Sequence, residues 1–235
     1  MTRTHHLTVR GLMGLLSLSS WLALGTPAAH AADYSFNCIS GNNAQSCADG
    51  QSRLSLQVTQ AVGNQVDFTF RNLSVLGSSI TEIYFDDGTL LGIASVIDSG
   101  DGVTFSQVGS ANPANLPSGG NLSPAFVATQ GFVVDTGNGG PGKGVENKLD
   151  GGTQEFVTIR FNLINGKNFA DTLAALNGPL GDGNDLRVGV HARSFSNGTS
   201  ESFVTATAVA EPDSGLLAIA ALGVTGLLGA RRRPR

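Results

Sequence analysis

Apolar and polar residues alternate along much of the middle of the chain. The alternation is clearest at residues 54–58, 66–71, 157–161 and 186–193. A period of two with one apolar face is typical of a half-buried β-strand. Less regular alternation predicts further strands at residues 80–85, 90–97, 103–108, 132–134 and 203–209. Turns between them are predicted at Asp87-Gly88, Ser99-Gly100, Asn138-Gly139 and Asn197-Gly198.

Apolar residues recur at helical spacing in one segment. Its stripe consists of Phe169, Ala170, Leu173, Ala174 and Leu176. Gly178 and Pro179 follow and predict the end of the helix. We therefore expect an all-β body, an antiparallel β-sandwich of jelly-roll-like form, with this one short helix in a connection.

The first residues have the pattern of an export signal. Arg3 and Arg10 form a basic lead, and residues 11–24 are an apolar run interrupted only by serines. Pro27 and the small-x-small sequence Ala29-His30-Ala31 come next. This pattern predicts a signal peptide at residues 1–31, which signal peptidase removes so that the mature chain begins at Ala32. The alternative is that the segment stays as an N-terminal anchor.

The last residues have a different pattern. Residues 215–230 are sixteen positions without a charge, and they end in Arg231, Arg232, Arg233 and Arg235. As a helix this span is about 24 Å long, slightly less than a hydrocarbon core of about 30 Å. Snorkelling arginines cover part of the difference, and they belong on the cytoplasmic side of the membrane. We expect a C-terminal transmembrane helix that leaves the body outside.

This ending resembles the PEP-CTERM sorting domain of Gram-negative bacteria. The family has Pro-Glu-Pro before the apolar span, and here the motif is Ala210-Glu211-Pro212. Residues 79–88, 112–117, 186–195 and 201–204 also resemble domains of PEP-CTERM proteins. The resemblance implies cutting by an exosortase, a membrane cysteine protease-transpeptidase, and it implies location rather than chemistry.

These patterns predict three parts: a signal peptide at 1–31, a β-sandwich at 32–210 and a sorting tail at 211–235. The precursor is then anchored in the inner membrane, and the processed protein reaches the cell surface or the extracellular space. After processing, residues 32–212 hold eight basic and seventeen acidic residues, a formal charge of −9. That charge disfavours nucleic acid and anionic membrane as partners.

Two cysteines remain in the processed body, and they are nine positions apart. In an exported chain, Cys38 and Cys47 are expected to form a disulfide. A catalytic cysteine is the alternative, and it requires a histidine. His191 is the only histidine left in the body. It is predicted to face solvent from the polar side of its strand, without a second base or a set of metal ligands.

Calcium is the cofactor that the sequence leaves open, although none is required. Hard oxygen ligands on loops suit this ion. The candidates are Asp86, Asp87, Asp98, Asp101, Asp182 and Asp185. None of them fits an EF-hand spacing, and aspartates that form turns explain them equally well. Residues 137–143 fit Gly-x4-Gly-Lys, but Gly144 stands where a phosphate loop needs Ser or Thr.

No catalytic triad, metal set or general base is apparent, so we expect a non-enzymatic surface or matrix protein associated with exopolysaccharide or biofilm. The alternative is a calcium- or glycan-binding module delivered by the same route. Sugar platforms usually stack on aromatic faces. The processed body has no Trp and only Tyr34 and Tyr84, and its phenylalanines are predicted to be buried.

Overall fold

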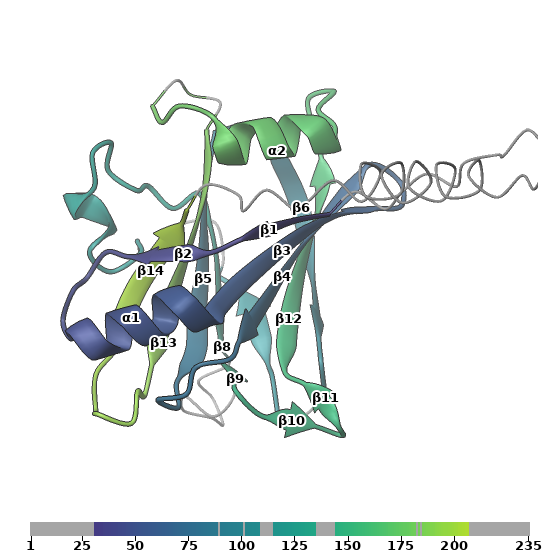
Figure 1. Ribbon diagram of the computed structural model, residues 1–235. Coiled ribbons are helices and arrows are strands. Elements are labelled where there is room, and N and C mark those ends of the chain that lie inside the picture. Colours follow the sequence, from purple (N-terminus) through teal and green to yellow (C-terminus); the bar gives the residue numbers. More distant parts are fainter. Residues whose placement is uncertain are drawn as a thin grey trace, which may run out of the picture.

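Two antiparallel sheets face each other in the computed structural model (Figure 1). The structure describes residues 31–88, 90–100, 102–108, 115–134, 144–181, 183 and 185–206. Sheet A has the order β1 (Ala31–Tyr34), β3 (Leu54–Ala61), β4 (Gln65–Asn72), β12 (Phe156–Leu163), β6 (Leu91–Asp98). Sheet B has the order β2 (Phe36–Cys38), β14 (Glu201–Thr205), β13 (Leu186–Arg193), β5 (Ser79–Asp87), β8 (Gln130–Val134), β7 (Phe105–Gln107). The short strand β9 (Val145–Glu146) also belongs to this sheet and pairs with β5. β10 (Leu149–Asp150) and β11 (Thr153–Gln154) form a small separate hairpin.

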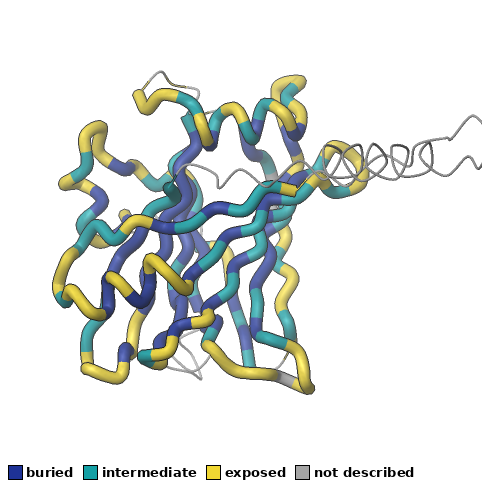
Figure 2. The backbone as a smooth tube through the Cα atoms, in the orientation of Figure 1, coloured by how far each residue is buried: buried dark blue, intermediate teal, exposed yellow. Residues whose placement is uncertain are grey.

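The antiparallel β-sandwich predicted from the alternation is confirmed. Each strongly alternating segment forms a strand, and its apolar residues are buried between the sheets (Figure 2). Within sheets A and B, three pairs of successive strands are neighbours: β3–β4, β7–β8 and β13–β14. This order does not establish the jelly-roll-like connectivity that we expected.

Phenylalanine side chains fill the centre of the sandwich. Phe68 and Phe161 come from sheet A, and Phe85 and Phe132 come from sheet B; all four are fully buried. Their rings, with that of Phe70, meet edge to face at centroid separations between 4.8 and 6.4 Å. This geometry suits the ring quadrupoles, so the two sheets are joined by directional contacts as well as by burial of apolar area.

The described residues contain two α-helices, so the expectation of one short helix was wrong. α2 (Phe169–Asn177) is the predicted helix, and it begins with a capping box between Asn168 and Asp171. Its buried positions are Phe169, Thr172 and Leu176, whereas Ala170 and Ala174 of the predicted stripe are exposed.

The missed helix is α1 (Ala44–Arg53). Its N-cap is Asn43, whose side chain accepts hydrogen bonds from the backbone N–H groups of Gln45 and Ser46. It buries only small or polar residues, Ser46, Cys47, Asp49 and Gly50. A Cβ atom at Gly50 would lie 2.2 Å from the Phe203 ring, so the glycine allows the helix to approach the core closely.

The loop of residues 115–128 covers part of the outer face of sheet B and contains the 3-10 turn η1 (Gly119–Asn121). Leu116 and Phe126 of this loop pack with Tyr84 in a small second core. A Cβ atom at Gly189 would lie 2.6 Å from Leu116, so a glycine is needed where the loop crosses β13. As a result β13 is buried on both faces rather than on one.

Candidate functional site

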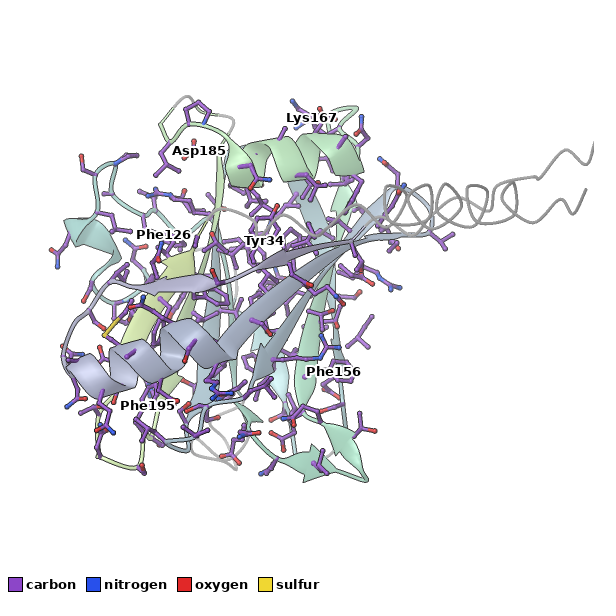
Figure 3. All side chains as sticks on the ribbon, viewed as in Figure 1. Tyr34, Phe126, Phe156, Lys167, Asp185 and Phe195 are labelled. Carbon is purple, nitrogen blue, oxygen red and sulfur yellow. A yellow bond between two sulfur atoms is a disulfide. The ribbon has the colours of Figure 1, made fainter. Side chains whose placement is uncertain are left out.

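Cys38 and Cys47 form the predicted disulfide, with an S–S distance of 2.00 Å (Figure 3). The bond joins β2 to the first turn of α1. The fully buried Glu201 carboxylate lies next to it and accepts hydrogen bonds from the Ser40 hydroxyl at 2.5 Å and from the backbone N–H of Asn43 at 2.6 Å. Glu201 thus organises the loop that carries the N-cap of α1, which explains why a charged group is buried there.

Asp86 and Asp87, two of the calcium candidates, already have protein partners. Asp86 forms an ion pair with the buried Arg187 and accepts a hydrogen bond from the Val127 backbone at 3.1 Å. Asp87 accepts hydrogen bonds from the backbone N–H groups of Leu90 and Leu91, both at 3.0 Å. These carboxylates therefore hold the covering loop and the turn between β5 and β6.

The other calcium candidates are distributed over the sandwich. Asp98 is exposed and is the last residue of β6, whereas the Asp87 turn precedes the first residue, Leu91. The length of this strand, about 23 Å, therefore separates Asp98 from the Asp87 turn. Asp185 directly precedes β13, and a Cβ atom at Gly88 would lie 2.4 Å from the Gly183 carbonyl oxygen. The structure therefore brings the loop before Asp185 against the turn after Asp87. Asp101 and Asp182 lie outside the described residues.

One group of three metal-ligating side chains occurs in the part of the chain that the structure describes. Its members are Cys38, Cys47 and Glu201, whose ligand atoms lie within 4.8 Å of one another. Both sulfur atoms are already used in the disulfide, and Glu201 accepts hydrogen bonds from the neighbouring loop. The chemistry of this group is therefore that of a structural cross-link.

His191 does not face solvent as predicted, because only 8% of the residue is exposed. It lies directly opposite Glu82 in the register of β13 and β5, and its Nδ1 is 3.2 Å from Glu82 Oε2. Tyr84 donates its hydroxyl to the same oxygen at 2.7 Å, and Arg193 donates to Oε1 at 2.5 Å. The sequence-based prediction missed this cluster because Glu82 and Tyr84 are far from His191 in the chain.

Burial alone would raise the pKa of the Glu82 carboxyl. The hydrogen bonds from His191 and Tyr84 and the charges of His191 and Arg193 outweigh that effect, so the pKa of Glu82 is lowered. The pKa of Tyr84 is raised by burial, and its hydrogen bond to Glu82 raises it further. The stable state of the cluster is therefore an ionised Glu82 beside a neutral Tyr84.

A carboxylate bonded to Nδ1 of an imidazole is the arrangement that orients a histidine general base. The residue opposite His191 on β14 is Ser202, which is only 1% exposed. A substrate cannot reach that hydroxyl. Among the described residues, no accessible nucleophile is placed beside His191, and the cluster acts as a cross-strand tie between β5 and β13.

Aromatic side chains offer little surface for sugar stacking. Eleven of the twelve phenylalanines are buried and Phe156 is half-buried, as the strand pattern predicted. Tyr34 and Tyr84 are 1% and 2% exposed. A glycan that contacts the described part of the chain must therefore bind through hydrogen bonds and aliphatic contacts.

Two clefts are comparable in size. One, of about 510 Å³, lies between the end of α2 and the strand ends around Arg187 and Thr205. The other, of about 480 Å³, lies near the hairpin β10–β11 and is lined by polar residues, including Ser194 and Ser196, together with Val75. Both have the size of a small-ligand pocket.

The two ends of the described body meet at Ser35. This residue lies between β1 of sheet A and β2 of sheet B, and its carbonyl oxygen accepts a hydrogen bond from Ala206 N at 2.9 Å. The sorting motif Ala210-Glu211-Pro212, the span at 215–230 and the arginines Arg231, Arg232, Arg233 and Arg235 lie outside the described residues. Of the helices that are described, none has the length and apolarity to cross a membrane.

Comparison of the chain with known protein families, with curated proteins and with solved structures gives no match.

Proposed function

We propose that this chain is an exported surface or matrix protein, processed by signal peptidase and an exosortase, whose β-sandwich is non-enzymatic and associates with exopolysaccharide. The observation that carries the proposal is the hydrogen bond between Ala206 and Ser35. It fastens the last described residue to Ser35, the residue between the first two strands. The residues next to both predicted processing segments therefore lie in the same part of the described fold.

The N-terminal strand supports a cut before Ala32. In β1, Ala31 pairs with Thr59 and Ala32 pairs with Val58. Removal of residues 1–31 eliminates the outermost pair of β1 and β3, Ala31 with Thr59. The pairs of Asp33 and Tyr34 stay in place. A signal peptide that ends at Ala31 is therefore compatible with the fold.

The last described strand ends before the predicted cut near Glu211. β14 ends at Thr205, so none of the described strands or helices extends to the Glu-Pro motif. The Cys38–Cys47 disulfide adds support, because such bonds form and persist in oxidising compartments outside the cytoplasm.

The proposal is tested by replacing Glu211 and Pro212 with Ala in cells that contain the exosortase and in cells that lack it. The expected result is a slightly larger, membrane-retained form, because the uncut tail remains as a single-pass anchor. Ser214→Ala is the matched control and should be processed like the natural chain. Replacing Arg231–Arg233 should instead disturb orientation. A tail that is equally intact in both kinds of cell contradicts exosortase sorting.

Calcium binding is a second candidate, favoured by the contact between Gly88 and Gly183. That contact places the loop before Asp185 against the turn that follows Asp87. Thermal unfolding with calcium and with a chelator tests this function, with Asp185→Asn as the variant and Asp98→Asn as the distant control. Equal midpoints in both conditions exclude it.

A further inference from the structure

A polar cleft of about 480 Å³ opens at the end of the sandwich opposite α2. Three segments form it: residues 74–78 after β4, residues 146–148 at the end of β9 and in the turn before β10, and residues 194–196 after β13. Phe195, whose neighbours on both sides line the cleft, marks this end in Figure 3, whereas Lys167 lies near α2 at the other end.

The walls of the cleft are fixed by contacts within the fold. Ser196 N donates to Leu76 O at 2.7 Å, and the Asn147 side chain donates to Ser74 O at 2.9 Å. Asp49 of α1 accepts hydrogen bonds from the backbone N–H groups of Val75 and Leu76. A ligand therefore meets a preformed site and does not have to order these loops, which reduces the entropic cost of binding.

The turn after β13 presents two hydroxyl groups to the cleft. Ser194 and Ser196 are exposed, and neither hydroxyl has a hydrogen-bond partner in the described part of the chain. The intervening Phe195 is 2% exposed and anchors the turn in the core. Ser194 has φ +58°, a conformation rare for residues other than glycine. This turn conformation leaves both serines at the cleft.

Carboxylates outnumber cations at the cleft. The Lys148 ammonium is 2.7 Å from a Glu146 carboxylate oxygen and 3.4 Å from an oxygen of the fully buried Glu155. With Asp49 behind the loop of residues 74–78, one cation beside three carboxylates gives a formal charge of −2. The field therefore disfavours an anionic ligand, while the serine hydroxyls, the exposed part of Glu146 and the ammonium can each bond a hydroxyl group.

We propose that this cleft is a subsite for a neutral, hydroxyl-rich saccharide unit. The inference rests on the proposed function as a surface or matrix protein, and it names the ligand class and the site. The exposed aliphatic side chain of Val75 at the cleft supplies the apolar contact that aromatic rings do not. A few exposed hydrogen bonds give weak binding per site. Many copies on one polymer give useful avidity.

The test is co-sedimentation of the mature protein, purified from its native cell, with insoluble neutral polysaccharides and with a polyuronate gel. The natural protein should be retained on at least one neutral polymer and not on the polyuronate. The double variant Ser194→Gly, Ser196→Ala removes both hydroxyls and keeps a residue that tolerates positive φ. It should lose at least about threefold in the retained fraction, since roughly 1 kcal/mol is a factor of about five in affinity.

Ser123→Ala, in the other cleft, is the matched control and should be retained like the natural protein. Lys148→Gln is the second variant, in case the serine variant does not fold, and it should also weaken retention. No retention on any neutral polymer, retention that both cleft variants leave unchanged, or preference for the polyuronate each overturns the proposal. A protein whose tail is cut but that binds no saccharide refutes this inference and the association with exopolysaccharide and leaves the sorting intact, whereas a saccharide-binding protein with an uncut tail refutes the sorting alone.

Discussion

His191 and Glu82 are direct neighbours across β13 and β5, with Nδ1 of the imidazole 3.2 Å from Oε2 of the carboxylate. The pair is mostly buried, since the side chains are 11% and 15% exposed. The Glu82 carboxylate also accepts a hydrogen bond from the Tyr84 hydroxyl, so neutral as well as charged donors stabilise its negative charge. The stability of sheet B should therefore depend on the ionisation of Glu82.

We predict that Glu82→Gln lowers the free energy of unfolding at neutral pH by about 1–3 kcal/mol, the usual cost of leaving buried partners unsatisfied. The folded-state pKa of Glu82 is lowered, so its stabilising contribution is present above the unfolded pKa and is lost as pH falls through the folded value. Urea unfolding at several pH values should show the natural protein losing more stability than the variant from about pH 5 downward. Asp98→Asn, at an exposed position, is the control. Parallel pH profiles for the natural protein and Glu82→Gln exclude this role.

The tyrosines give a prediction at alkaline pH. Tyr34 and Tyr84 are the two tyrosines of the chain, and burial raises the pKa of both phenols. A raised pKa means that their stabilising contribution is present below the unfolded value of about 10 and is lost as pH rises through the folded value. The ultraviolet absorbance of tyrosinate should therefore appear only together with unfolding. A tyrosine that titrates normally in the folded protein contradicts the burial.

The disulfide should stabilise the body. Replacing both Cys38 and Cys47 with Ala removes a short cross-link and should lower the free energy of unfolding by about 2–3 kcal/mol in the entropic model. The measurement is chemical unfolding of the natural and variant proteins with and without a dithiol reductant. The reductant should shift the unfolding midpoint of the natural protein only. An equal midpoint for all four samples shows that the cysteines are not bonded.

The position of α1 depends on Gly50. Gly50→Ala places a methyl group 2.2 Å from the Phe203 ring, and overpacking of this kind costs about 1–3 kcal/mol. Gly120→Ala is the matched control, because a Cβ atom there meets no other atom within 4 Å. Thermal unfolding should separate the two variants. If Gly50→Ala is as stable as Gly120→Ala, α1 does not pack on the core as described.

The β-sandwich could be predicted from the local alternation of apolar and polar residues, whereas the candidate site depends on contacts between segments that are distant in the sequence. The strand of residues 186–193 was predicted from its alternation, but its polar face is buried because the loop of residues 115–128 crosses sheet B. Nothing in the local sequence around His191 indicates that cover. A hydrophobic stripe identifies α2, but α1 has none. α1 instead depends on its Asn43 cap and on Glu201, which is distant in the sequence.

The central claim is that both ends of this chain are removed in the cell, and the intact mass of the protein isolated from its native cell tests it most directly. The account predicts a chain that begins at or near Ala32, contains the Cys38–Cys47 bond and ends near the Ala210-Glu211-Pro212 motif. The same protein from cells without the exosortase should retain its C-terminal arginines. A mass that includes both Met1 and Arg235 in exosortase-containing cells contradicts the account.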